Sequence, residues 1–258
     1  MMSDLAPDVR VELHDRLKRP ASASTVPGPL TVLFFGDLLT AEIATVSLNP
    51  SRREYTNNRG EELEGAERRF ETLNSLQASA RASMSDEQCD RAIATMRGYF
   101  DPDKPAYSWF ASLSRVVQGM GYDYQRREVA HLDLVQEATD PTWSKLLSEK
   151  PSEGRSLLES DAPFLQWQIE RFPLKALFCN GRTAFDQVVN LTHSHVVVSE
   201  TRARLRWTIA VGSIGERRIA VVGWNIPLAR PTGLTAQDHV AMGQLSKQHL
   251  EALGIETS

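Results

Sequence analysis

Four short runs of apolar and β-branched residues recur along the chain, and segments with helical periodicity lie between them. The runs cover Ile43–Leu48, Val129–Val135, Leu174–Phe178 and Arg218–Gly223. Buried strands that alternate with helices form a sheet whose faces the helices cover. The sequence therefore predicts an α/β fold, in the form of a three-layer α/β/α sandwich around a central, mostly parallel four-stranded sheet.

The rest of the chain adds an arm, helices and further strands. Residues 1–29 combine a short helical stretch with a run rich in Pro and Ser, which predicts an N-terminal arm or linker before a single domain over residues 30–258. Ser85 and Gln88 form a capping-box pattern. Helices are predicted over Asp8–Lys18, Glu61–Ala82, Ser85–Tyr99, Ser108–Gln118, from Asp140 onward, and over Leu157–Phe172, Thr183–Leu191 and Ala236–Leu253; further strands are predicted over Leu30–Phe35, Val196–Val198 and Leu205–Val211.

Composition narrows the class of protein. The chain has 258 residues, a formal net charge of -4 and two cysteines, Cys89 and Cys179, far apart in sequence. Two such cysteines cannot build a disulfide framework, a zinc site or an iron–sulfur site, and no apolar run reaches the length of a membrane span. We therefore expect a monomeric cytoplasmic protein without metal or cofactor. The acidic balance disfavours general nucleic-acid binding, although a basic cleft can coexist with it.

Each of the four apolar runs ends in polar or turn residues. These ends are Asn49-Pro50, Asp133–Gln136, Asn180-Gly181 and Asn225–Pro227. Pro50 cannot donate to a sheet ladder, so the first strand must stop there. Because parallel strands bring their carboxyl ends to one edge of a sheet, we expect these polar groups to converge on a single cleft.

The order of these segments resembles that of the uracil-DNA glycosylase superfamily. In that family a strand ends in an Asn-Pro-Ser or Asn-Pro-Gly turn, and further motif strands and a second catalytic loop follow. The corresponding segments of this chain are Leu48–Ser51, His131–Val135, Pro163–Gly181 and Trp224–Arg230, which together with the intervening residues span most of the sequence. The resemblance implies a hydrolase that flips a base out of DNA and cleaves its N-glycosidic bond.

The resemblance also assigns catalytic roles. Asn49 matches the asparagine that positions the attacking water in the mismatch branch of the family, and the base would leave as an anion. The second loop departs from the commoner histidine pattern, and Asn225 stands where a side chain would hold the base carbonyl. A neutral amide stabilises a developing oxyanion less than a charge does. By themselves, Asn49 and this loop are equally typical of a turn cap and a rigid proline-containing loop.

Asp133 stands where the uracil-reading members have asparagine. An ionised aspartate only accepts hydrogen bonds, so it would repel O4 of uracil but accept from the N4 amino group of cytosine. This favours a cytosine-type base, such as a 5-substituted, glucosylated hydroxymethylcytosine of phage DNA, and a role in phage defence. The alternative is a structural acid paired with an arginine or with His131.

Further residues are expected at the DNA and at the base. By the resemblance, Tyr55 or Phe70 would stack on the flipped base, although the helical spacing of Phe70 is equally typical of core packing. The expected DNA contacts are Ser51, Arg52, Arg53, Asn180, Gly181, Leu228 and Arg230. Two other functions remain open at this point: a uracil or mismatch glycosylase of base-excision repair, and a nucleic-acid-binding protein on this fold that has lost catalysis.

Overall fold

The computed structural model describes residues 4–104, 106–202, 204–228 and 233–255. The chain divides into two compact units that each combine several segments. Unit 1 comprises Met1–Gly36, Asn49–Ala106 and Val135–Pro163, and unit 2 comprises Asp37–Leu48, Tyr107–Leu134 and Phe164–Ser258. No helix in the described part of the chain is long and apolar enough to cross a membrane.

Unit 2 contains a mixed sheet of six strands in the order β2-β1-β3-β6-β5-β4. The strands are β1 (Ile43–Ser47), β2 (Val129–Asp133), β3 (Ala176–Asn180), β4 (His195–Arg202), β5 (Leu205–Ile214) and β6 (Arg217–Trp224). Strand β1 pairs in parallel with β2 and β3, and β3 pairs in parallel with β6. The α/β class is confirmed.

The predicted number of four strands is wrong, because β4 and β5 extend the sheet. The connection between β5 and β6 contains only Gly215 and Glu216, and such a short turn can join only antiparallel strands. Gly215 has a φ of 56°, which glycine adopts without a side-chain clash. The antiparallel strand β4 pairs with β5 and forms the edge of the sheet.

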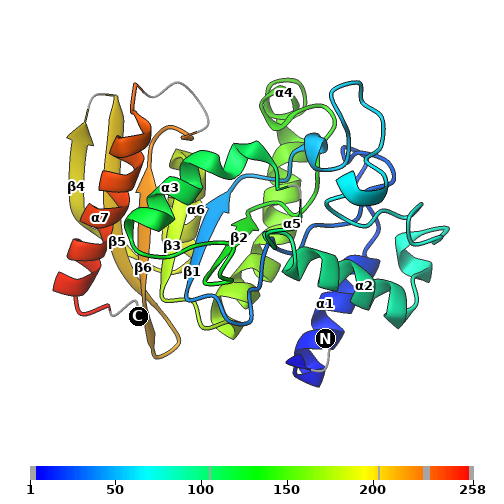
Figure 1. The fold of residues 1–258 in the computed structure, drawn as a ribbon, viewed down its shortest axis with the longest axis horizontal. Helices are drawn as coiled ribbons and strands as arrows, with labels where there is room; N and C mark the ends of the chain where they lie inside the picture. Colours follow the sequence, from blue (N-terminus) through cyan, green and yellow to red (C-terminus); the bar gives the residue numbers. More distant parts are fainter. Residues whose placement is uncertain (1–3, 105, 203, 229–232, 256–258) are drawn as a thin grey trace. The chain divides into compact units, whose positions relative to one another are not determined.

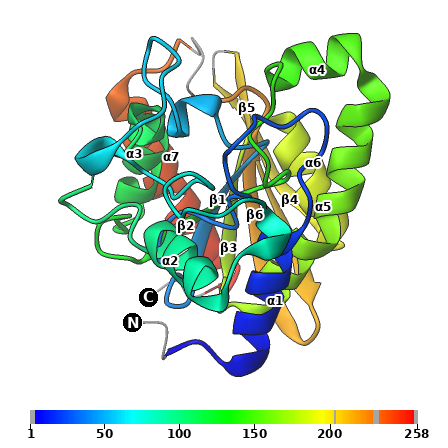
Figure 2. The same cartoon turned by 90° about the vertical axis from the view of Figure 1, so that its right-hand side faces the viewer.

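Helices cover both faces of this sheet. Helices α3 (Ala111–Gly119) and α7 (Ala236–Ala252) lie on one side and α6 (Arg182–Leu191) on the other, as Figures 1 and 2 show. Two glycines allow α3 and α7 to approach closely. A Cβ on Gly119 would lie 2.1 Å from the carbonyl oxygen of Val240, and one on Gly243 would lie 1.9 Å from that of Val116.

Unit 1 is built from helices and long irregular segments. It contains α1 (Pro7–Lys18), α2 (Asp86–Arg97) and α4 (Trp143–Glu149), with short 3-10 turns at Arg52–Glu54, Gly65–Glu67 and Arg81–Ser83. The helix α5 (Pro151–Arg171) is divided between the units after Pro163. Ser85 and Gln88 form the predicted capping box at the start of α2.

Residues 1–29 contribute buried side chains to unit 1. The side chains of Leu13, Leu17 and Val26 are buried within unit 1. The boundary between an arm over residues 1–29 and one following domain stays a prediction.

Two predicted elements of unit 1 are wrong. Residues 61–82 form turns instead of a helix, because side chains bind the local backbone: Ser75 Oγ accepts from the Thr72 amide, and Thr72 Oγ1 accepts from the Ser75 amide. Such bonds compete with helical ones. Leu30–Phe35 is buried but forms no continuous strand in the described part of the chain: Val32 donates to the Gln136 carbonyl, and Phe35 is a single bridge residue.

Candidate functional site

Asn49 follows β1 at the start of a segment of unit 1, and its half-buried amide has one fixed orientation. Its Nδ2 lies 3.2 Å from the carbonyl oxygens of Pro50 and Glu137 and 3.2 Å from Thr139 Oγ1. Carbonyl oxygens only accept, so the nitrogen must face them. The oxygen Oδ1 then has no hydrogen-bond partner among the residues that the structure describes. It is therefore available as an acceptor for a water molecule.

A buried ion pair holds the segment to which Asn49 donates. The Glu137 carboxylate accepts from Arg81 Nη1 at 2.6 Å and from Arg81 Nη2 at 2.9 Å. Thr31 Oγ1 donates to the same carboxylate at 2.9 Å. Because these partners fix Glu137, they also fix the carbonyl that orients Asn49. Sequence analysis missed Glu137 and Thr139, since no local pattern marks a contact between residues this far apart in the chain.

The residues after Asn49 form an exposed basic turn in unit 1. Ser51 caps the turn by accepting from the Arg53 amide at 3.2 Å. Arg52 and Arg53 are exposed, and Arg52 lies 3.6 Å from Asp140. Exposed guanidinium groups can contact phosphates, and contacts of Arg52 and Arg53 with DNA stay a prediction.

Tyr55 and Phe70 belong to a buried aromatic cluster of unit 1. Their residues are 3% and 1% exposed, and their ring centroids lie 5.8 Å apart. Phe70 also stacks on Tyr99 at 5.0 Å, and the Tyr55 hydroxyl donates to the Leu30 carbonyl. Burial holds the pKa of the Tyr55 phenol well above its ordinary value. These contacts are those of core residues, the alternative that the helical spacing of Phe70 left open.

Asp133 ends β2 in unit 2 and lies beside His131. His131 Nε2 is 3.4 Å from Asp133 Oδ1, and the side chains of both residues are 2% exposed. On the other side of the imidazole, Nδ1 lies 2.7 Å from Thr45 Oγ1, which in turn lies 2.7 Å from the Tyr124 hydroxyl. Burial raises the pKa of Tyr124 above its ordinary value. This chain of polar contacts orients the ring that faces Asp133.

Asn180 connects three carboxyl ends of the sheet in unit 2. Its Oδ1 accepts from Trp224 Nε1 at 3.0 Å and from the Leu228 amide at 2.9 Å. Its Nδ2 donates to Ser47 Oγ at 3.4 Å. The residue is buried, as is Leu228, so both support the loop after β6. Gly181 has a φ of 112° and lies against Pro227, where a Cβ would approach to 3.1 Å.

Both polar atoms of the Asn225 side-chain amide are hydrogen-bonded to backbone groups of unit 2. Its Oδ1 accepts from the Arg206 amide at 2.7 Å, and its Nδ2 donates to the Arg204 carbonyl at 3.3 Å. Holding a base carbonyl would require Nδ2 to leave Arg204. In this structure the side chain secures the loop to the start of β5.

Within unit 2, the strand register places Ser47 opposite Asp133, and Asn180 opposite Trp224, at the carboxyl ends of their strands. Asn49 belongs to unit 1, and its convergence with Asp133 and Asn225 stays a prediction. Arg230 lies outside the described residues. No group of three or more His, Cys, Asp or Glu side chains in the described ranges could hold a metal ion. A scan of protein-family models finds none that matches this sequence, and a search of curated proteins finds no match either.

Proposed function

We propose that this protein is a DNA glycosylase on a uracil-DNA glycosylase-like fold. The observation that supports this most strongly is the Asn49 amide, whose nitrogen is held by Glu137 and Thr139. An amide fixed through its nitrogen presents its oxygen as a preorganised acceptor, and preorganised acceptors orient a nucleophile without further loss of entropy.

In the proposed reaction, Asn49 Oδ1 accepts a hydrogen bond from a water molecule. This bond directs the oxygen of the water toward the sugar C1′. The bond between C1′ and the base nitrogen breaks, and the electron pair leaves with the base. The new bond joins the water oxygen to C1′. The proton lost from the water ends on the departing base, because an amide cannot hold it. The products are the free base and an abasic site.

Asp133 is the proposed reader of the base. A carboxylate oriented by His131 at 3.4 Å would accept from the N4 amino group of a cytosine-type base. A preference for a 5-substituted cytosine, such as the glucosylated hydroxymethylcytosine of phage DNA, would spare unmodified cytosine. On this proposal the biological role is defence against phage.

The test is an abasic-site assay on oligonucleotides that carry uracil, a thymine mismatch, 5-hydroxymethylcytosine or its glucosylated form. We expect product from the modified cytosines, a loss of about 100-fold or more in Asn49→Ala, and a changed base preference in Asp133→Asn. Product from uracil alone would instead identify a repair glycosylase. An unchanged base preference in Asp133→Asn would exclude its role in reading the base.

A second candidate is a nucleic-acid-binding protein without catalysis. The observation that favours it is the Asn225 amide, which is bound to the backbone of Arg204 and Arg206. This candidate predicts binding of DNA that Asn49→Ala leaves unchanged, with no abasic product from any of the four oligonucleotides.

A further inference from the structure

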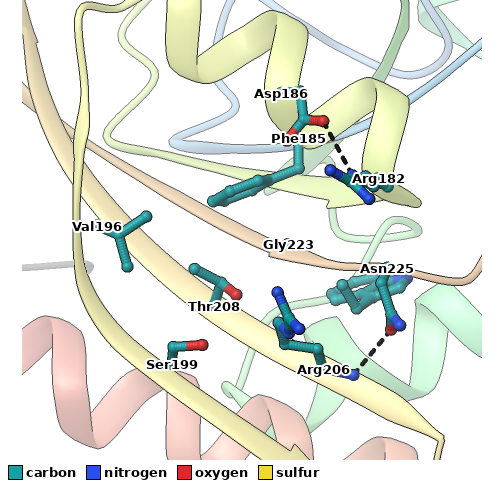
Figure 3. A pocket seen from close by; sticks show the side chains of 10 residues that line it. Arg182, Phe185, Asp186, Val196, Ser199, Arg206, Thr208, Gly223 and Asn225 are labelled. Atoms are coloured by element: carbon teal, nitrogen blue, oxygen red, sulfur yellow. Dashed lines mark hydrogen bonds and ion pairs between the residues drawn. The ribbon is translucent and has the colours of Figure 1, made fainter.

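A cavity of about 350 Å³ lies in unit 2 on the side of the sheet that α6 covers. Its polar lining includes Arg182, Arg206, Ser199 and Thr208, and Phe185 and Val196 are among its apolar walls (Figure 3). A volume of this size is typical of sites for small molecules.

The strand register builds the floor of this cavity. Ser199 of β4, Thr208 of β5 and Gly223 of β6 lie opposite one another in a row across three strands. A Cβ on Gly223 would lie 2.3 Å from the Phe185 ring, so the glycine is what admits this ring against the sheet. Arg206 stands two residues before Thr208 on β5, and its side chain therefore emerges on the same face.

The polar groups of the cavity are suited to an anion. Arg206 has no acidic partner among the described residues, and Arg182 uses its Nε toward Asp186 at 3.3 Å. The two arginines and one aspartate leave an excess of one positive charge in the lining. Arg182 is also the first residue of α6, the end at which a helix dipole is positive. Guanidinium groups bind phosphate oxygens through two parallel hydrogen bonds.

Thr208 gives a second, independent indication of a ligand. The residue is 8% exposed and lines the cavity, and its hydroxyl has no hydrogen-bond partner in the parts of the chain that the structure covers. Figure 3 shows Arg182, Arg206 and Thr208 directed toward the same space, with the Phe185 ring beside it. The Thr208 hydroxyl therefore faces the cavity and is available to donate to a ligand there.

We propose that this cavity binds a small phosphate monoester that carries a planar ring, of the size of a nucleoside monophosphate. The phosphate would lie between the guanidinium groups of Arg182 and Arg206 and accept from Thr208. The ring would pack on Phe185, since flat rings stack favourably on aromatic side chains. The proposal does not depend on glycosylase activity, so either can fail without the other.

The test is isothermal titration calorimetry of the full chain with thymidine 5′-monophosphate, thymidine and inorganic phosphate. We expect the monophosphate to bind at least about tenfold more tightly than thymidine, and inorganic phosphate to displace it, because a hydrogen bond to a charged group is worth a factor of this order. Equal affinity for thymidine, a failure of phosphate to compete, or no binding of the monophosphate would overturn the proposal.

Single substitutions in the cavity lining test whether the monophosphate binds there. Arg206→Gln and Thr208→Val should each weaken binding, whereas Arg126→Gln, which removes one exposed positive charge of unit 2 outside the cavity, should leave it unchanged. Circular dichroism checks that each variant folds, and Arg182→Gln, which removes the other proposed phosphate contact, replaces Thr208→Val if the latter does not fold. Equal losses in Arg206→Gln and Arg126→Gln would show non-specific attraction and refute the site.

Discussion

The ion pair between Arg81 and Glu137 gives the sharpest prediction about stability. The side chains are 4% and 9% exposed, and their atoms approach to 2.6 Å. Glu137→Gln leaves the Arg81 guanidinium buried without a counter-charge. Removing one partner of a buried pair costs about 3–5 kcal/mol, a large part of the roughly 5–15 kcal/mol that stabilises a typical domain.

Urea denaturation followed by circular dichroism measures this cost. The matched control is Glu149→Gln, which removes the partner of Lys145 from an exposed pair at 3.7 Å. That pair is of the type worth about 0.3–0.5 kcal/mol. We expect Glu137→Gln to lower the free energy of unfolding several times more than the control does. Equal effects of the two substitutions would refute the expectation that breaking the buried pair costs more than breaking the exposed one.

A double variant tests whether the side chains of Arg81 and Glu137 are energetically coupled. Arg81→Met with Glu137→Met removes both charges, and a buried pair replaced by apolar residues is often neutral in stability. We therefore expect the double variant to be more stable than Glu137→Met alone. A double variant that loses the sum of the two single losses would show that the two side chains are not coupled.

Three further predictions concern other parts of the chain. Gly243→Ala should lower the free energy of unfolding by about 1–3 kcal/mol in urea denaturation, because its Cβ would meet the Val116 carbonyl; an unchanged value would contradict the close helix contact. The hydrogen bond from the Arg10 guanidinium outweighs desolvation and holds the pKa of Asp90 below its ordinary value. Ionised Asp90 therefore stabilises the fold above the unfolded pKa of about 3.9, and this stabilisation is lost as pH falls through the folded pKa. The stability difference between wild type and Asp90→Asn should therefore shrink below about pH 4, and a difference independent of pH would contradict this. Burial raises the pKa of the Cys179 thiol, so alkylation should require unfolding, and rapid labelling of the native protein would contradict its burial.

The sequence predicts best where a local pattern determines the structure. Ser85 and Gln88 form the predicted capping box, and Pro50 follows the end of β1 as its missing amide requires. It predicts least well where contacts between side chains and backbone replace the regular hydrogen bonds that the apolar spacing suggests. The apolar spacing of residues 61–82 resembles a helix, but the hydrogen bonds between Thr72 and Ser75 replace the helical ones.

In the candidate site, too, the sequence indicates the polar residues themselves but not the groups that bind them. The polar strand ends were evident from the sequence, including Asp133, Asn180 and Asn225. Their partners were not, because the Glu137 carbonyl that orients Asn49 and the Arg206 amide that binds Asn225 are backbone groups. Backbone groups carry no sequence signal, so only the fold reveals which amide has an oxygen available.

Abasic-site formation on DNA with glucosylated 5-hydroxymethylcytosine, compared between wild type, Asn49→Ala and Asn49→Asp, tests the proposed glycosylase reaction directly. We expect product from wild type and a loss of about 100-fold or more in Asn49→Ala. We also expect a loss in Asn49→Asp, because a carboxylate cannot donate to the Pro50 and Glu137 carbonyls that fix the Asn49 amide. Folding of both variants is checked by circular dichroism. Wild-type product that Asn49→Ala leaves undiminished would contradict the role of this residue, and the absence of wild-type product from this DNA would contradict the proposed reaction.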